Sequence, residues 1–101
     1  MAYKLVWSLL ARDDLREIVR FISRDSPQRA QAFAIRLISQ ADMLQEQPEI
    51  GRVVLEYHQP HVREIIFRPY RIIYRVDHER ARVEIARVWH AARGTPEPLD
   101  G

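Results

Sequence analysis

The spacing of the apolar residues changes near the middle of this 101-residue chain. Between residues 9 and 47, apolar side chains recur every three or four positions, which is typical of amphipathic helices. After Gly51 they alternate with polar side chains, as they do in β-strands. Pro48 and Gly51 separate the two halves, because a proline disfavours helix at the residue before it. The sequence therefore predicts a helical half followed by a sheet half.

The helical half is predicted to be a hairpin of two helices that follows a short strand. Residues 3–7 have the aromatic and β-branched content of a strand, and Ser8 can cap the first helix. Ser26 and Pro27 suit the start of the second helix, because serine accepts from free amides and proline has no N–H that would need a partner there. The second helix should stop near Gln47.

The second half is predicted to form an antiparallel sheet, because its connections are short. The predicted strands cover residues 53–57, 62–68, 70–76 and 82–90. Strands that follow a helical hairpin predict an α+β fold in which the helices pack on one face of a mainly antiparallel sheet and leave the other face open. Residues 94–101 have the composition of a flexible tail. We therefore expect one domain over residues 1–93 and a flexible tail over residues 94–101.

Side chains alternate between the two faces along each predicted strand. On the strand from residue 70, the set expected to meet the helices is Tyr70, Ile72, Tyr74 and Val76, and the set expected on the open face is Arg71, Ile73 and Arg75. On the return strand over residues 82–90, polar and apolar residues alternate less regularly. Periodicity alone leaves its inward side undecided.

Several kinds of site are excluded by what the chain lacks. It has no cysteine, so disulfides and zinc–thiolate sites are impossible. Glycine occurs only at positions 51, 94 and 101, which leaves no phosphate-binding loop or nucleophile elbow. His58 and His61 could bind a metal, but without a third ligand they are more typical of a solvated turn. We therefore expect no metal and no cofactor.

The N-terminal sequence bears on where the protein acts. The charged run Arg12-Asp13-Asp14 comes too early to leave room for a secretory signal, and no apolar stretch is long enough to span a membrane. We expect a cytoplasmic protein with no membrane partner.

The cations of the sheet half are the candidate functional residues. The formal net charge is only +2, which alone does not predict nucleic-acid binding, and Lys4 is the only lysine. Arginines near aromatic residues could hold a phosphodiester and stack a base, or bind an acidic protein segment. They could equally reflect coding bias, or form a solvated face paired with Glu64, Glu84 and Asp77. The candidates are Arg63, Arg68, Tyr70, Arg71, Arg75, Trp89, His90 and Arg93.

A set of short motifs, taken in order, resembles a known superfamily. The most useful are Ala11-Arg12-Asp13-Asp14-Leu15, Pro48-Glu49-Ile50-Gly51-Arg52, Tyr70-Arg71-Ile72-Ile73-Tyr74-Arg75-Val76 and Arg87-Val88-Trp89-His90. In that order, from about residue 7 to residue 93, the chain resembles the RelE/ParE superfamily of toxins from bacterial type II toxin–antitoxin systems. The long helical hairpin, the Pro-Glu-Ile-Gly-Arg junction and the Arg-Val-Trp-His ending look more like the ParE branch.

The resemblance implies a partner and two alternative targets. The partner is a cognate antitoxin that folds around the toxin in a hetero-oligomer, with an interface that we expect to be partly electrostatic. ParE-like members bind DNA gyrase without chemistry of their own, whereas RelE-like members cut messenger RNA on the ribosome without metal. A family member that has lost toxicity is a third possibility.

The implied roles of the candidate residues differ between the two branches. In a RelE-like toxin, Arg71 would stabilise phosphate charge and His90 would act as acid or base, with Glu56 as a candidate base by proximity only. In a ParE-like toxin these residues would be binding or structural. The residues expected to contact the target or the antitoxin are Arg63, Arg68, Tyr70, Arg75, Trp89 and Arg93.

Overall fold

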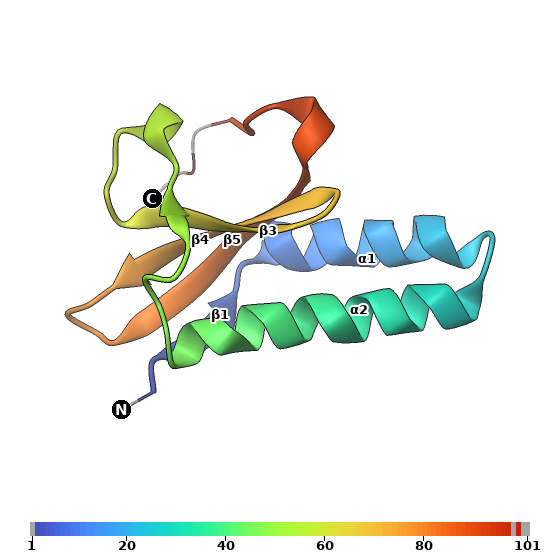
Figure 1. Ribbon diagram of the computed structural model, residues 1–101, viewed down its shortest axis with the longest axis horizontal. Helices are drawn as coiled ribbons and strands as arrows, with labels where there is room; N and C mark the ends of the chain where they lie inside the picture. Colours follow the sequence, from blue (N-terminus) through green and yellow to red (C-terminus); the bar gives the residue numbers. More distant parts are fainter. Residues whose placement is uncertain (1, 98, 100–101) are drawn as a thin grey trace.

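The computed structural model describes residues 2–97 and residue 99 (Figure 1). The strands are β1 (Lys4–Trp7), β2 (Arg52–Val53), β3 (Val62–Phe67), β4 (Tyr70–Asp77) and β5 (Arg82–His90). The α-helices are α1 (Leu9–Ser23) and α2 (Pro27–Asp42). Three short 3-10 helices are η1 (Met43–Gln45), η2 (Leu55–Tyr57) and η3 (Ala91–Arg93).

The five strands form one sheet in the order β1-β5-β4-β3-β2. β1 runs parallel to β5, and all the other neighbouring strands are antiparallel. The two helices lie side by side along one face of the sheet (Figure 1). The α+β prediction is therefore confirmed.

The helix starts follow the predicted capping residues. The Ser8 hydroxyl oxygen accepts a hydrogen bond from the Ala11 amide at 3.0 Å, and the Ser26 hydroxyl oxygen accepts one from the Arg29 amide at 3.1 Å. Pro27 occupies the first position of α2. These contacts satisfy amides that have no partner within the helix, so both predicted starts are confirmed.

The predicted strand over residues 53–57 is wrong for most of its length. β2 ends at Val53, and the chain then turns into η2. The turn buries Val54 against the sheet and brings Tyr57 to the same apolar cluster, whereas Leu55 remains 76% exposed. The strand interpretation assumed that side chains alternate between the two faces here. The structure instead packs Val54 and Tyr57 into the same cluster.

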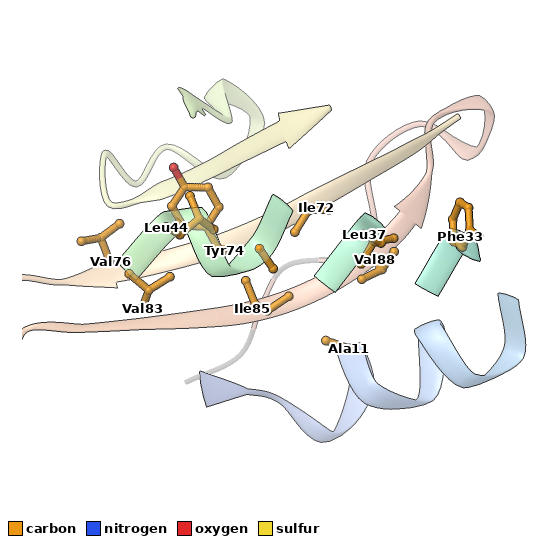
Figure 2. Close-up of a cluster of buried hydrophobic side chains, with 11 residues drawn as sticks. Ala11, Phe33, Leu37, Leu44, Ile72, Tyr74, Val76, Val83, Ile85 and Val88 are labelled. Carbon is orange, nitrogen blue, oxygen red and sulfur yellow. The ribbon is translucent and has the colours of Figure 1, made fainter. Parts of the chain in front are cut away.

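The main core lies between the sheet and the helices (Figure 2). Ile72, Tyr74 and Val76 of β4 all belong to it, as their alternation predicted. The side chains that the helices contribute are Ala11, Phe33, Leu37 and Ala41, and η1 adds Leu44.

An extra residue in β5 accounts for its irregular pattern. Ile73 pairs with Arg87 but Tyr74 pairs with Ile85, so Ala86 is left over as a β-bulge. Because the bulge shifts the alternation by one residue, Ile85 before it and Val88 after it both reach the main core. The inward side that periodicity left undecided therefore changes within the strand.

The second face of the sheet is partly covered, which corrects the prediction of an open face. Val54, Val62 and Ile73 form a second buried cluster there, and Leu99 packs against it. The Tyr57 hydroxyl donates a hydrogen bond to the Pro96 carbonyl oxygen at 3.1 Å. Contacts with the rest of the chain are made by Gly94, Thr95, Pro96 and Leu99. The flexible tail expected over residues 94–101 stays a prediction. Residues 98, 100 and 101 of that tail lie outside the described residues.

Among the residues described, no helix combines the length and the apolar character that crossing a membrane requires.

Candidate functional site

Arg71 lies in a buried ion-pair network on the second face of the sheet. Its Nε donates to Glu64 Oε1 at 2.5 Å, and its side chain is only 9% exposed. The other Glu64 oxygen accepts from Arg52 Nε at 2.8 Å. Arg71 Nη1 donates to the Gly94 carbonyl oxygen and to the Thr95 hydroxyl oxygen. Arg71 thus ties β3, β4 and the C-terminal segment together, and most of its donors are already used.

His90 lies on the opposite face. In the β4–β5 pairing, His90 stands across from Tyr70, whereas Arg71 stands across from Trp89. Successive residues point to opposite faces, and the His90 ring contacts the Tyr70 ring at 5.2 Å between centroids. His90 Nδ1 also accepts a hydrogen bond from the Ala92 amide at 3.1 Å. The structure therefore does not bring the two predicted catalytic residues together.

Glu56, the candidate base, lies in η2 beside the C-terminal segment. Hydrogen bonds from its own backbone amide and from the Thr95 hydroxyl lower the pKa of its carboxyl group. A lowered pKa makes a carboxylate a weaker proton acceptor, which does not favour the role of a general base.

Two more candidates, Arg75 and Trp89, share the second face with Arg71. Arg75 Nη2 donates to Glu84 Oε1 at 2.6 Å, which fixes it across the β4–β5 pair. Trp89 contacts two guanidinium groups, because Arg87 lies 4.8 Å and Arg93 3.8 Å from its ring centroid. In both arrangements the arginine already contacts another side chain, so an additional ligand would have to share that arginine.

The remaining candidates lie elsewhere. Arg63 Nη1 donates to the Gly51 carbonyl oxygen at 2.7 Å, so it holds the junction between α2 and β2. Tyr70 packs edge to face against Phe33 of α2, with 5.6 Å between the ring centroids. Arg68 is exposed at the β3–β4 turn and has no partner among the residues described. The predicted single arginine surface is therefore divided between both faces and one end of the sheet.

One end of the sheet does gather exposed candidates. The Ala91 amide donates to the Pro69 carbonyl oxygen at 2.9 Å, which places η3 next to the β3–β4 turn. Arg68 and Arg93 are both exposed at this end, and His90 is the N-cap residue of η3. These residues offer positive charge that no described carboxylate neutralises directly.

The sequence interpretation missed a surface between the two helices. A hollow of about 360 Å³ lies there, and its lining residues are Trp7, Arg12, Leu15, Arg16, Val19 and Ile38. A second hollow of about 410 Å³ lies near the tip of the hairpin, and its lining includes Phe21, Arg29, Phe33 and Arg36. The signal in the sequence was an excess of apolar positions on the helices. Phe21 and Ile35 are 66% and 60% exposed, and neither belongs to the core that the sequence predicts.

Apolar side chains and arginines line both hollows, and Asp25 also lines the second. Arg12 and Arg16 line the first hollow, and Arg29 and Arg36 line the second. In the first hollow Arg16 pairs with Asp13, and both side chains are more than 60% exposed, so the pair is weak. This combination suits an amphipathic helix that carries apolar residues on one side and acidic residues at its borders.

Comparisons with known proteins agree on one family. Residues 5–94 match the family model described as the ParE toxin of type II toxin–antitoxin systems, parDE. Over 91 residues the chain is 40% identical to the protein named Toxin RelE2 from Caulobacter vibrioides, an alignment that covers 89% of this chain and 97% of that protein.

Solved structures share the fold. The chromosomal ParDE toxin–antitoxin system from P. aeruginosa matches with a TM-score of 0.72 at 22% identity, over 88% of this chain and 96% of that one. The RelBE2 toxin–antitoxin complex from Mycobacterium tuberculosis gives 0.65 at 24%, over 91% and 94%. A mutant of the E. coli toxin RelE in the free state gives 0.69 at 21%, over 93% and 88%. Because the family model matches residues 5–94, which is most of this chain, the chain belongs to the ParE toxin family of the RelE/ParE superfamily.

Proposed function

We propose that this toxin poisons DNA gyrase by binding it and performs no chemistry of its own. The observation that carries the proposal is the separation of Arg71 from His90 on opposite faces of the sheet. Cleavage of RNA through its 2′-hydroxyl needs a proton acceptor and a cation near the same phosphate. Arg71 is also held by Glu64 and by the C-terminal segment, so it would have to leave a buried ion pair to reach a substrate.

The exposed end of the sheet is the surface that we assign to target binding. Arg68 and Arg93 lie there without a described carboxylate partner, next to Tyr70 and His90. Arg63 and Arg75, in contrast, are held by Gly51 and Glu84. We therefore expect Arg68 and Arg93 to contribute more to target affinity than the other predicted binding residues.

Supercoiling of relaxed plasmid by purified gyrase tests this function directly. The toxin should inhibit supercoiling and accumulate cleaved plasmid, and an Arg68→Ala, Arg93→Ala double variant should be weaker. Arg24→Ala at the end of α1 is the control, because it removes an exposed arginine from the tip of the helical hairpin instead of the sheet. Normal supercoiling with the toxin in excess would contradict the proposal.

Ribosome-dependent cleavage of messenger RNA is the second candidate. It is favoured by the 40% identical relative, which carries the name Toxin RelE2. Transcript cleavage in a translating extract is the measurement for this activity. If the wild-type chain cuts and an Arg71→Ala, His90→Ala double variant does not, the toxin is an endoribonuclease. Equal growth arrest by both chains would favour gyrase.

We also propose that a cognate antitoxin lays an acidic amphipathic helix over the hollows of the helical hairpin. Two of the related structures are toxin–antitoxin systems. In this chain, the support is the combination of apolar side chains with two arginines in the lining of each hollow, because charge complementarity selects an acidic partner and speeds association.

A charge placed in the first hollow should separate the antitoxin surface from other exposed positions. Ile38→Asp should weaken antitoxin binding in a calorimetric titration, because Ile38 lines the first hollow. Ile66→Asp on β3 is the control, since Ile66 is exposed to a similar extent, 45% against 39%. Association should also slow as salt is added. A larger effect at residue 66 than at residue 38 would place the antitoxin on the sheet instead.

A further inference from the structure

His78 is held between a phenol and a carboxylate that come from distant parts of the chain. It lies in the β4–β5 turn, and its Nδ1 is 2.7 Å from the Tyr3 hydroxyl oxygen. Its Nε2 is 2.8 Å from Glu49 Oε2 at the α2–β2 junction. The Tyr3 and His78 rings meet edge to face at an interplanar angle of 88°. The arrangement thus contains a nucleophile, a base and a residue that orients the base.

The two hydrogen bonds fix the direction of the phenolic proton when His78 is neutral. The ionised Glu49 carboxylate can only accept, so the ring proton must be on Nε2. Nδ1 is then an acceptor, and the Tyr3 hydroxyl must donate to it. This is the direction in which an imidazole removes the proton of an attacking hydroxyl, and the Glu49 charge stabilises the imidazolium that forms.

The other tyrosines lack this arrangement. Burial raises the pKa of Tyr57, Tyr70 and Tyr74, so their phenolates form less readily. The Tyr57 hydroxyl donates to the Pro96 carbonyl oxygen, and the Tyr74 hydroxyl oxygen accepts from the Gly51 amide. Of the four tyrosines, all of which lie within the described residues, only Tyr3 donates to a histidine ring nitrogen.

A hollow next to the Tyr3 hydroxyl gives room for a second reactant. It measures about 360 Å³, and Pro48, Ile50 and Gln47 line it together with the three residues of the relay. Its wall therefore combines apolar surface with one amide side chain. A small acyl group on a good leaving group fits this setting, because the acyl carbon can approach the phenol oxygen while apolar surface covers the rest.

We propose that Tyr3 is an activated phenol that accepts an acyl group from an activated acyl donor, with His78 as general base and Glu49 as the positioning residue. The phenol oxygen attacks the acyl carbon and the phenolic proton passes to His78 Nδ1. The bond from the acyl carbon to the leaving group then breaks, and the leaving group takes up that proton. Acylation removes the phenolic donor, so it also breaks the hydrogen bond between Tyr3 and His78 of the β4–β5 turn.

The inference is tested with N-acetylimidazole on the full-length protein, with acetylation at each tyrosine measured by peptide mass spectrometry. Tyr3 should react before the other three tyrosines. The raised pKa of each of the other three tyrosines would by itself also favour Tyr3, so the deciding variant is His78→Gln. Loss of the imidazole leaves the phenol at least as accessible, yet it should slow Tyr3 acetylation by about tenfold, the modest effect expected for a half-exposed general base.

Two further variants complete the test. Glu49→Gln should slow the reaction less than His78→Gln, because it removes only the orienting charge. His58→Gln is the matched control, since His58 is exposed and makes no hydrogen bond or ring contact with a tyrosine among the residues described, and the rate should not change. Circular dichroism of each variant establishes that the fold is kept. An unchanged or faster Tyr3 reaction in a folded His78→Gln chain would overturn the inference.

Discussion

Glu64 binds Arg71 with one carboxylate oxygen and Arg52 with the other, at 2.5 and 2.8 Å. The two arginines differ sharply in exposure, with 9% of the Arg71 side chain exposed against 70% for Arg52. One acidic residue thus serves both a buried cation and a surface cation. The contribution of each pair to stability must differ accordingly, because water competes only for the exposed one.

Removal of Glu64 should therefore be costly. Glu64→Ala leaves the Arg71 charge buried and without its carboxylate, which we expect to lower the free energy of unfolding by about 3–5 kcal/mol. Arg52→Ala, the control, breaks only the exposed pair and should cost no more than about 1 kcal/mol. Urea denaturation followed by circular dichroism measures both. Similar losses in the two variants would show that the buried pair has no special weight.

A second prediction concerns Asp14, which holds the edge of β5. Its carboxylate accepts from Arg87 Nε at 2.8 Å, from Arg87 Nη2 at 2.9 Å and from the Val88 amide at 3.0 Å. Asp14→Asn keeps the size but loses the charge, so stability should fall by roughly 2 kcal/mol. Asp13→Asn should change stability little, because its pair with Arg16 is exposed. Thermal unfolding of the two variants gives the comparison, and equal melting temperatures would refute it.

The alkaline limit of stability follows from the buried phenols. Burial raises the pKa of Tyr57, Tyr70 and Tyr74, whereas in the unfolded chain these groups titrate at about 10. Above that pH the unfolded chain has lost more protons than the folded one. Stability that is present below pH ~10 is therefore lost as the pH rises towards the folded-state values.

Tyr70→Phe is the best variant for this test, because the Tyr70 hydroxyl makes no hydrogen bond among the residues described. Its free energy of unfolding should fall less steeply above pH ~10 than that of the wild-type chain. Urea titrations at several alkaline pH values give both slopes. A parallel decline would mean that Tyr70 does not contribute.

Gly51 is required by close packing. A Cβ at this position would lie 2.5 Å from the Glu64 carbonyl oxygen and 2.6 Å from the Tyr74 hydroxyl oxygen. We expect Gly51→Ala to cost about 1–3 kcal/mol, because neighbouring backbone must move. Tyr74→Phe removes one of the two obstructing atoms, so the two substitutions should not be additive in a double-mutant cycle. Strictly additive losses of stability would mean that the whole cost of Gly51→Ala comes from the Glu64 backbone.

The sequence predicted the elements whose determinants are local. Ser8, Ser26 and Pro27 start their helices through contacts within three residues, so the hairpin could be located without tertiary information. The face of β4 followed from simple alternation. In contrast, the turn that replaces most of the strand over residues 53–57 depends on Val54 packing against Ile73, which lies far along the chain.

The candidate site was harder to predict because it depends on register. The sequence indicated arginines at positions 71 and 75 on one face, and that is where they lie. It could not show that Glu64 occupies the position opposite Ile73, close enough to bind Arg71, or that the C-terminal segment returns to cover that arginine. Arg71 was therefore interpreted as available when it is already bound.

The bulge at Ala86 shifts, within a single strand, which residues point to which face of the sheet. Before it, Ile85 faces the helices; after it, Val88 does so while Arg87 turns to Asp14 at the sheet edge. If the strand instead kept strict alternation through Ala86, Arg87 would point towards the core and Val88 away from it. The bulge thus lets β5 supply core side chains on both sides of Ala86 while Arg87 stays within reach of the Asp14 carboxylate.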